Sequence, residues 1–330
     1  MSRLPIRPAV LAAGAAGLSY AALRQRPPGG EGTWSRTNHR GEPVTLLEGP
    51  AVAIGGMAGA LAAPGRTGRD RAAMLVAGTA AAALGGYDDL AGSGSSRGFR
   101  GHLGALRQGE LTTGAVKLIG IGAAGLAASA LLGPGGVRRG RGRGAADLVI
   151  NAGLVAGGAN LMNLFDLRPG RAIKVALLTG GLLSATSQRG RTAAAAPLGA
   201  SAALLVEDLG ERAMLGDAGA NALGALLGAA AAAGLPRAAR VVTLGVVVGL
   251  TAASEVVSFS QVIERTGPLR WLDMLGRRPA PARHRGTGLG GRASRAAGTG
   301  PAADGATADG ATADGAEAGP TAPARVPPGD

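Results

Sequence analysis

Apolar residues fall in blocks that are separated by short breaks rich in arginine and glycine. Within each block the apolar positions leave no polar face, which is typical of helices surrounded by lipid or by other helices. The spacing predicts nine segments, at residues 5–23, 47–63, 72–87, 113–132, 145–165, 172–185, 193–206, 216–234 and 241–263. The predicted fold class is therefore all-α, a polytopic membrane helix bundle.

The last part of the chain has a different composition. From residue 266 onward Pro, Gly, Ala and Arg dominate, and Ala-Asp-Gly-Ala-Thr recurs between Asp304 and Gly315. Such a segment has too few large apolar side chains to form a core. We therefore predict one transmembrane domain over residues 1–265 and a disordered tail over residues 266–330.

The order of the segments predicts where the polar motifs lie. If the segments cross the membrane alternately, the breaks that follow segments one, three, five, seven and nine open on one face. These breaks carry nearly all the distinctive polar residues, namely Asn38, Arg40, Asp88, Asp89, Asn163, Asp166, Asp217 and the polar end of segment nine. The other breaks offer mainly arginines and small residues. We expect the motif residues to converge.

Charge and composition narrow the function classes. The net charge is +13, but aromatic residues make up only 2% and the arginines are spread over many breaks. This argues against nucleic acid as a partner and favours anionic lipid head groups and phosphorylated substrates. The absence of cysteine excludes disulfides and thiol catalysis. The expected location is the plasma membrane, and arginines between residues 265 and 285 favour a cytoplasmic position for the motif face and tail.

Acidic residues near helix ends supply the candidate chemistry. Asp88 and Asp89 follow an apolar run, where negative charge is costly and opposes the helix dipole. A bound cation would offset both effects. Mg²⁺ prefers oxygen ligands, and phosphoryl transfer needs cations around the phosphate oxygens. We therefore predict that the motif face binds Mg²⁺ and a diphosphate, with Lys117 and the nearby arginines as further cationic groups.

Each residue taken alone has an ordinary structural alternative. Asp217 could cap a helix, and Asn163 could hydrogen-bond between helices. Lys117 could be a boundary charge whose stem lies along apolar surface. His102, in a basic loop with Arg97 and Arg100, has no second histidine nearby and is more typical of a loop than of a metal ligand.

Five motifs occur in a fixed order along residues 38–265. They are Asp88-Asp89, Lys117, Asn163-x-x-Asp166, Gly216-Asp217-x-Gly219, and Ser254-Glu255 through Gln261. In this order the chain resembles the polyprenyl-phosphate N-acetylhexosamine-1-phosphate transferase superfamily, which includes phospho-N-acetylmuramoyl-pentapeptide transferase. The resemblance implies an Mg²⁺-dependent enzyme of cell-envelope glycan synthesis. It would transfer a phospho-sugar from a UDP-linked donor to undecaprenyl phosphate and release UMP.

The resemblance also implies roles for individual residues. Asp88 would deprotonate or position the lipid phosphate, and Asp89 would help to hold the donor and the metal, so both are expected to be catalytic. Asp217 would be a metal ligand, together with Asp89. The expected substrate-binding residues are Asn38, Arg40, Lys117, Asn163, Asp166, Arg168 and Arg171.

The sequence departs from the family pattern in three places. Leu167 and Arg168 follow Asp166, where the family has glycine and another acid. The stretch 268–273 replaces a histidine cluster, and a tenth helix is missing. The alternative function is therefore a catalytically inactive membrane scaffold that retains the fold and binds lipid-linked intermediates. An ion-coupled transporter fits less well, because the acids gather on one face and not at the membrane midplane. A homodimer is left open.

Overall fold

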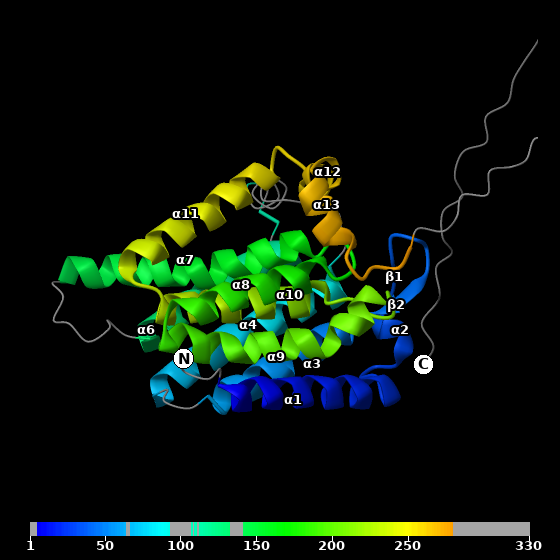
Figure 1. Ribbon diagram of the computed structural model, residues 1–330, viewed down its shortest axis with the longest axis horizontal. Helices are drawn as coiled ribbons and strands as arrows, with labels where there is room; N and C mark the ends of the chain where they lie inside the picture. Colours follow the sequence, from blue (N-terminus) through cyan, green and yellow to red (C-terminus); the bar gives the residue numbers. More distant parts are fainter. Residues whose placement is uncertain are drawn as a thin grey trace, which may run out of the picture. The chain divides into compact units, whose positions relative to one another are not determined.

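The computed structural model describes residues 5–63, 67–92, 107, 109–110, 112–132 and 141–279 (Figure 1). Over these residues the chain is mostly helical, with one short hairpin. Nine long helices are found in this part: α1 (Ile6–Gln25), α3 (Glu48–Leu61), α4 (Gly68–Ala91), α6 (Thr113–Leu132), α7 (Arg141–Phe165), α8 (Arg171–Thr186), α9 (Gln188–Leu209), α10 (Gly216–Gly234) and α11 (Arg237–Ser254). The short elements are α2 (Glu31–Trp34), β1 (Ser35–Thr37), β2 (Pro43–Thr45), α12 (Phe259–Arg265) and α13 (Gly267–Met274).

Eight of the nine long helices correspond to predicted segments one to eight, and α11 covers part of the ninth, but the helices differ in their ability to cross a membrane. In the described part of the chain, four are long and apolar enough to do so: α1, α6, α11 and residues Gly144–Phe165 of α7. Helices α3 and α8 have 14 and 16 residues. At 1.5 Å per residue they are shorter than a hydrocarbon core of about 30 Å. The helical class is confirmed, and four candidate spans are found where nine were expected.

Helix α10 lies at the centre of the bundle. Almost all of its residues are buried, and it packs on α7, α4, α9 and α3. Its contacts with α7 are backbone to backbone, since a Cβ atom at Gly224 would collide with the carbonyl oxygen of Gly158. A Cβ atom at Gly228 would collide in the same way with Leu154. This helix lacks a polar face because other helices surround it.

The ninth predicted segment is two helices and not one. Helix α11 ends at Ser254, and α12 begins at Phe259 after a turn that contains Glu255. The ring of Phe259 stacks on that of Phe165 at the end of α7, with centroids 5.2 Å apart. This contact holds α12 against the bundle in its new direction. The predicted continuous helix over residues 241–263 is therefore wrong.

The predicted domain boundary at residue 265 is too early. Helix α13 falls in the expected tail, and the described part of the chain continues to residue 279. Polar contacts hold this segment: Arg171 Nε lies 2.7 Å from Asp273 Oδ1, and Lys174 Nζ donates to the carbonyl oxygens of Leu272, Asp273 and Leu275. Composition predicted no core here, and the docking depends on side chains of α8. The rest of the predicted tail, residues 280–330, lies outside the described residues.

Close packing of α10 predicts a strong dependence on glycine. Replacing Gly224 with Ala should lower the free energy of unfolding by about 1–3 kcal/mol, because the added methyl group overpacks a backbone contact. Gly122→Ala in α6 is the matched control, since nothing lies within 4 Å of its Cβ position. It should stabilise the helix by about 0.5–1 kcal/mol. Thermal unfolding of both variants in one detergent measures the difference, and equal melting temperatures would contradict the central position of α10.

Candidate functional site

Asp88, the first residue of the acidic pair at the end of α4, binds to the start of α6. Asp88 Oδ1 accepts a hydrogen bond of 2.5 Å from Thr113 Oγ1, and Asp88 Oδ2 lies 2.6 Å from Lys117 Nζ. The preceding residue Thr112 caps α6, because its hydroxyl accepts from the backbone N–H of Ala115 at 3.1 Å. The cap fixes where α6 begins and therefore places both Thr113 and Lys117 against the carboxylate of Asp88.

Lys117 joins Asp88 to Asp217. Its ammonium group also contacts Asp217 Oδ2, and the three side chains are only 11%, 17% and 24% exposed, in the order Lys117, Asp88, Asp217. Two carboxylates this close repel each other, and the repulsion grows where water is scarce. The lysine offsets that repulsion with one positive charge against two negative charges. We call Asp88, Lys117 and Asp217 the acidic group. Its two carboxylates require a cation between them.

Asp89 has a different position from its neighbour. Its Oδ1 and Oδ2 atoms accept hydrogen bonds from the backbone N–H groups of Asp217 (3.0 Å) and Ala218 (2.9 Å). These N–H groups belong to the first turn of α10, which has no intrahelical acceptor for them. Gly216 has φ +58°, and a Cβ atom there would lie 3.0 Å from Asp89 Oδ2, so the turn requires glycine. Both oxygens of Asp89 therefore anchor α10 to α4, which favours a positioning role over metal ligation.

A second part of the site is a cavity of about 230 Å³ beside this anchor. Three of the predicted substrate-binding residues, Asn38, Asp166 and Arg168, lie in its wall. The wall also contains His39, Asp208 and Glu211. The backbone N–H of Gly216 hydrogen-bonds to Asp166 and so connects the cavity to the acidic group. The structure thus brings together motifs that are more than 100 residues apart in the chain.

Asp166 is the one acidic residue of the loop between α7 and α8, and the pKa of its side chain is raised. Loss of hydration raises the pKa of its carboxyl well above that of an ordinary aspartate, and the negative charges of Asp208, Asp217 and Asp89 raise this pKa further. The hydrogen bond from Gly216 opposes the increase. Asp166 therefore binds a proton more readily than an ordinary aspartate.

Two predicted substrate-binding arginines are engaged within the protein. Arg40 Nε lies 2.9 Å from Glu211 Oε2, and its two Nη atoms donate to the carbonyl oxygens of Arg278 and Pro279. Arg171 forms the buried ion pair with Asp273 described above and donates to Ser260 Oγ at 2.9 Å. Both arginines hold the C-terminal segment, and neither contacts the acidic group.

The last predicted residue, Asn163, lies one turn before Asp166, and its carbonyl oxygen accepts from the backbone N–H of Asp166 at 3.1 Å. Arg97, Arg100 and His102 of the predicted basic loop lie outside the described residues.

Several residues of the site were not predicted, among them His39 in the cavity wall. Thr113 contacts Asp88, and Arg36 on β1 donates through Nη2 to the carbonyl oxygen of Asp89 at 2.5 Å. Asp208 and Glu211 line the cavity. The two acids follow segment seven and therefore stand on the predicted motif face, so their position was a usable signal. Nothing in the sequence distinguishes Thr113 or Arg36 from other residues of these loops.

The acidic group meets one requirement of a magnesium site. In the part of the chain that the structure describes, no three or more His, Cys, Asp or Glu side chains are arranged to hold a metal ion by themselves. Asp88 and Asp217 nevertheless face one shared cation, Lys117. Mg²⁺ in nucleotide sites commonly takes one or two carboxylates and completes its shell with phosphate oxygens and water. Asp88 and Asp217 fit this pattern, whereas Asp89 does not.

Comparison with known proteins adds no relative. No family model matches the chain, and no curated protein matches it.

The anchor at Asp89 predicts a graded loss of stability. Asp89→Ala should lower the free energy of unfolding by about 0.5–2 kcal/mol, the usual cost of removing a helix cap. Asp89→Asn should cost less, because its amide oxygen still accepts one of the two N–H groups. Thermal unfolding in detergent measures both variants. Wild-type stability of Asp89→Ala would show that the cap does not hold α10.

The raised pKa of Asp166 predicts a pH-dependent effect of its removal. The folded pKa lies above the unfolded value near 3.8, so the wild-type protein loses stability as pH rises through the interval between them. Asp166→Asn lacks this titration and can still accept from Gly216. At pH 7 its melting temperature should exceed that of the wild type by about 2–4 °C, the shift that about 1 kcal/mol produces. The gain should vanish near pH 3.8, and a constant difference would contradict the assignment.

Proposed function

We propose that the chain is a membrane enzyme that transfers a phospho-sugar from a UDP-linked donor to a polyprenyl phosphate and releases UMP. The observation that supports this proposal is the group formed by Asp88, Lys117 and Asp217. These residues come from three helices, and they are the ones expected around a diphosphate from the resemblance of the motifs. The reaction belongs to cell-envelope glycan synthesis, of which peptidoglycan synthesis is one case.

The proposed reaction exchanges one phosphate bond for another. An oxygen of the polyprenyl phosphate attacks the sugar-bearing phosphorus of the donor, and the bond from that phosphorus to the bridging oxygen of UMP breaks. Mg²⁺, held by Asp88 and Asp217, would neutralise the charge that develops on the phosphate oxygens. Lys117 would contact the same oxygens, and Asp88 would orient the attacking phosphate or accept its proton. Asp89 would keep α10, and with it Asp217, in position.

The cavity beside Asp166 is the proposed place for the UDP portion of the donor. Arg168 lies in its wall, is 33% exposed on its side chain, and approaches Glu264 only at 4.0 Å. A weakly paired arginine remains available for a phosphate. Asn38 also lines this cavity, and hydrogen bonds from its side chain to Glu42 and Glu211 hold it in place. Asn163 is one helical turn away, at the end of α7.

The proposed location is the plasma membrane, with all nine long helices in or across the bilayer and the motif end in the cytoplasm, where UDP-sugars are made. Arg270, Arg277 and Arg278 belong to the same end, because Arg278 pairs with Glu42 at 2.7 Å beside Asn38. Positive charge of this kind favours the cytoplasmic side.

An inactive scaffold is the second candidate, and one set of contacts favours it. Lys117 fills the space between the two carboxylates, and Arg40 and Arg171 are occupied by Glu211 and Asp273. A scaffold with these contacts would bind a lipid-linked intermediate without turnover.

Release of UMP distinguishes the two candidates. Purified protein in detergent should release UMP from UDP-N-acetylglucosamine or a UDP-muramoyl donor when undecaprenyl phosphate and Mg²⁺ are present. Asp217→Asn should lower the rate by at least about 100-fold, as expected when an electrostatic contact to the transferring group is lost. Omitting Mg²⁺ or adding a chelator should have the same effect.

Arg189→Gln serves as the control, because Arg189 is exposed at the start of α9 and lies outside both parts of the site. It should retain activity. Absence of UMP with every donor, together with retained binding of undecaprenyl phosphate, would favour the scaffold.

A further inference from the structure

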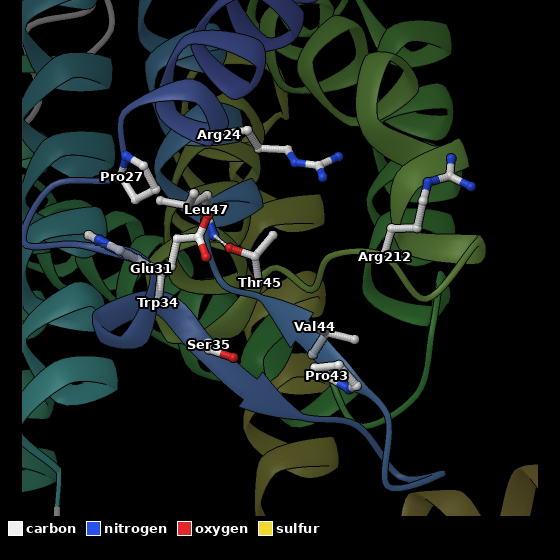
Figure 2. A pocket seen from close by; sticks show the side chains of 10 residues that line it. All are labelled: Arg24, Pro27, Glu31, Trp34, Ser35, Pro43, Val44, Thr45, Leu47 and Arg212. Carbon is white, nitrogen blue, oxygen red and sulfur yellow. Dashed lines mark hydrogen bonds between the residues drawn. The ribbon is translucent and has the colours of Figure 1, made fainter.

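A second polar cavity lies at the other side of the hairpin, where α1 ends. Its volume is about 250 Å³, and its wall includes Arg24, Glu31, Trp34, Thr45 and Arg212 (Figure 2). Among the described residues it shares none of its wall with the cavity beside Asp166 except Val44. None of its charged residues is used in the proposed reaction.

The charges of this cavity are arranged in two groups. Arg24 lies in the last turn of α1, and Arg212 lies in the loop between α9 and α10. In Figure 2 the side chain of Arg24 extends toward Arg212. Arg212 is paired with Glu207 through Nε (2.8 Å) and Nη2 (3.0 Å). Glu31 comes from α2 and forms no salt bridge with the described residues. The cavity thus offers guanidinium groups on one side and a free carboxylate on another.

The position of the cavity along α1 is that of a membrane interface. Helix α1 is one of the four candidate spans and exposes large apolar side chains, among them Leu18, which is 75% exposed. Val206 of α9, which packs beside α1, is 66% exposed. Arg24 lies at the end of α1, where a bilayer would give way to its head groups. Trp34 donates through Nε1 to the carbonyl oxygen of Pro28 at 2.7 Å, and tryptophan with one polar edge is typical of this level.

We propose that this cavity binds the head group of a zwitterionic phospholipid, such as phosphatidylethanolamine. Its phosphodiester would lie between Arg24 and Nη1 of Arg212, since Glu207 pairs with Nε and Nη2 of that arginine, and its ammonium group would pair with Glu31 beside the Trp34 ring. The acyl chains would run along the exposed apolar side chains of α1 and α9. A single phosphate would leave Glu31 without a partner, whereas the zwitterion satisfies both sets of charges. The proposal does not depend on the reaction proposed above.

The fluorescence of Trp34 provides the test. The chain has two tryptophans, and Trp271→Phe leaves Trp34 alone. The full chain, stripped of lipid in detergent, is titrated with short-chain phosphatidylethanolamine, phosphatidylglycerol or diacylglycerol, and with inorganic phosphate or UMP. Native mass spectrometry counts the retained lipid as a second readout. Melting temperatures of all variants check that they fold.

We expect a saturable change with phosphatidylethanolamine. Arg24→Gln and Arg212→Gln should each weaken it by about tenfold or more, as for loss of one charged hydrogen bond. Arg26→Gln is the matched control, because Arg26 is exposed and adjacent but lies outside the cavity wall, and it should bind as the wild type does. Phosphatidylglycerol should bind more weakly, and Glu31→Gln should remove that difference.

Other results would overturn the proposal. Equal binding by Arg24→Gln, Arg212→Gln and the wild type would show that the guanidinium groups do not hold a phosphate. Equal binding of diacylglycerol would reduce the site to apolar contact. A response only to inorganic phosphate or only to UMP would identify a site for a soluble anion or a nucleotide. Lack of lipid in both readouts would show that the cavity holds none.

Discussion

Backbone contact around α10 is the constraint on which the rest of the structure depends. Gly224 and Gly228 meet the backbone of α7, and Gly85 of α4 meets the carbonyl group of Asp217. A side chain at any of these positions would push the helices apart by about the size of a methyl group or more. The start of α10 carries Asp217, so the same close approach that builds the bundle also brings Asp217 to the end of α4.

Charge compensation is the second constraint, and it acts where the helices end. Asp88 and Asp217 both pair with Lys117. The negative charge of Asp89 is stabilised by two N–H groups at the positive end of a helix dipole. The two neighbouring aspartates therefore differ in function for a geometric reason. Asp88 faces the cation, and Asp89 faces the backbone. This division makes Asp88 and Asp217 the pair that suits a metal and a diphosphate.

The C-terminal segment closes the motif end of the bundle. The side chains of Arg171 and Lys174 bind α13, and Arg40 binds the carbonyl oxygens that follow it. Hydrogen bonding from Arg171 and the charges of Arg171, Arg277 and Lys174 lower the pKa of Asp273, although its burial acts in the opposite direction. Of these cations, Arg40 and Arg171 were expected at the substrate, because their positions along the chain lie on the motif face. Their partners, however, come from a segment whose composition resembles that of a tail.

The sequence by itself determined the positions of the helices up to α10 and which of the motif residues share one end of the bundle, but not the break after α11 or helix α13. Apolar blocks broken by arginines give the helix positions, and alternation of the blocks places Asn38, Asp88, Asp166 and Asp217 at one end, because each of these residues follows an odd-numbered block. Tertiary structure alone decided the partners. Asp89 caps α10, and Thr113 binds Asp88. Arg40 and Arg171 bind the C-terminal segment. Each of these contacts depends on how closely separate elements approach one another. The distance between packed helices is set by glycine contacts between segments more than 50 residues apart. A local sequence pattern therefore does not predict it.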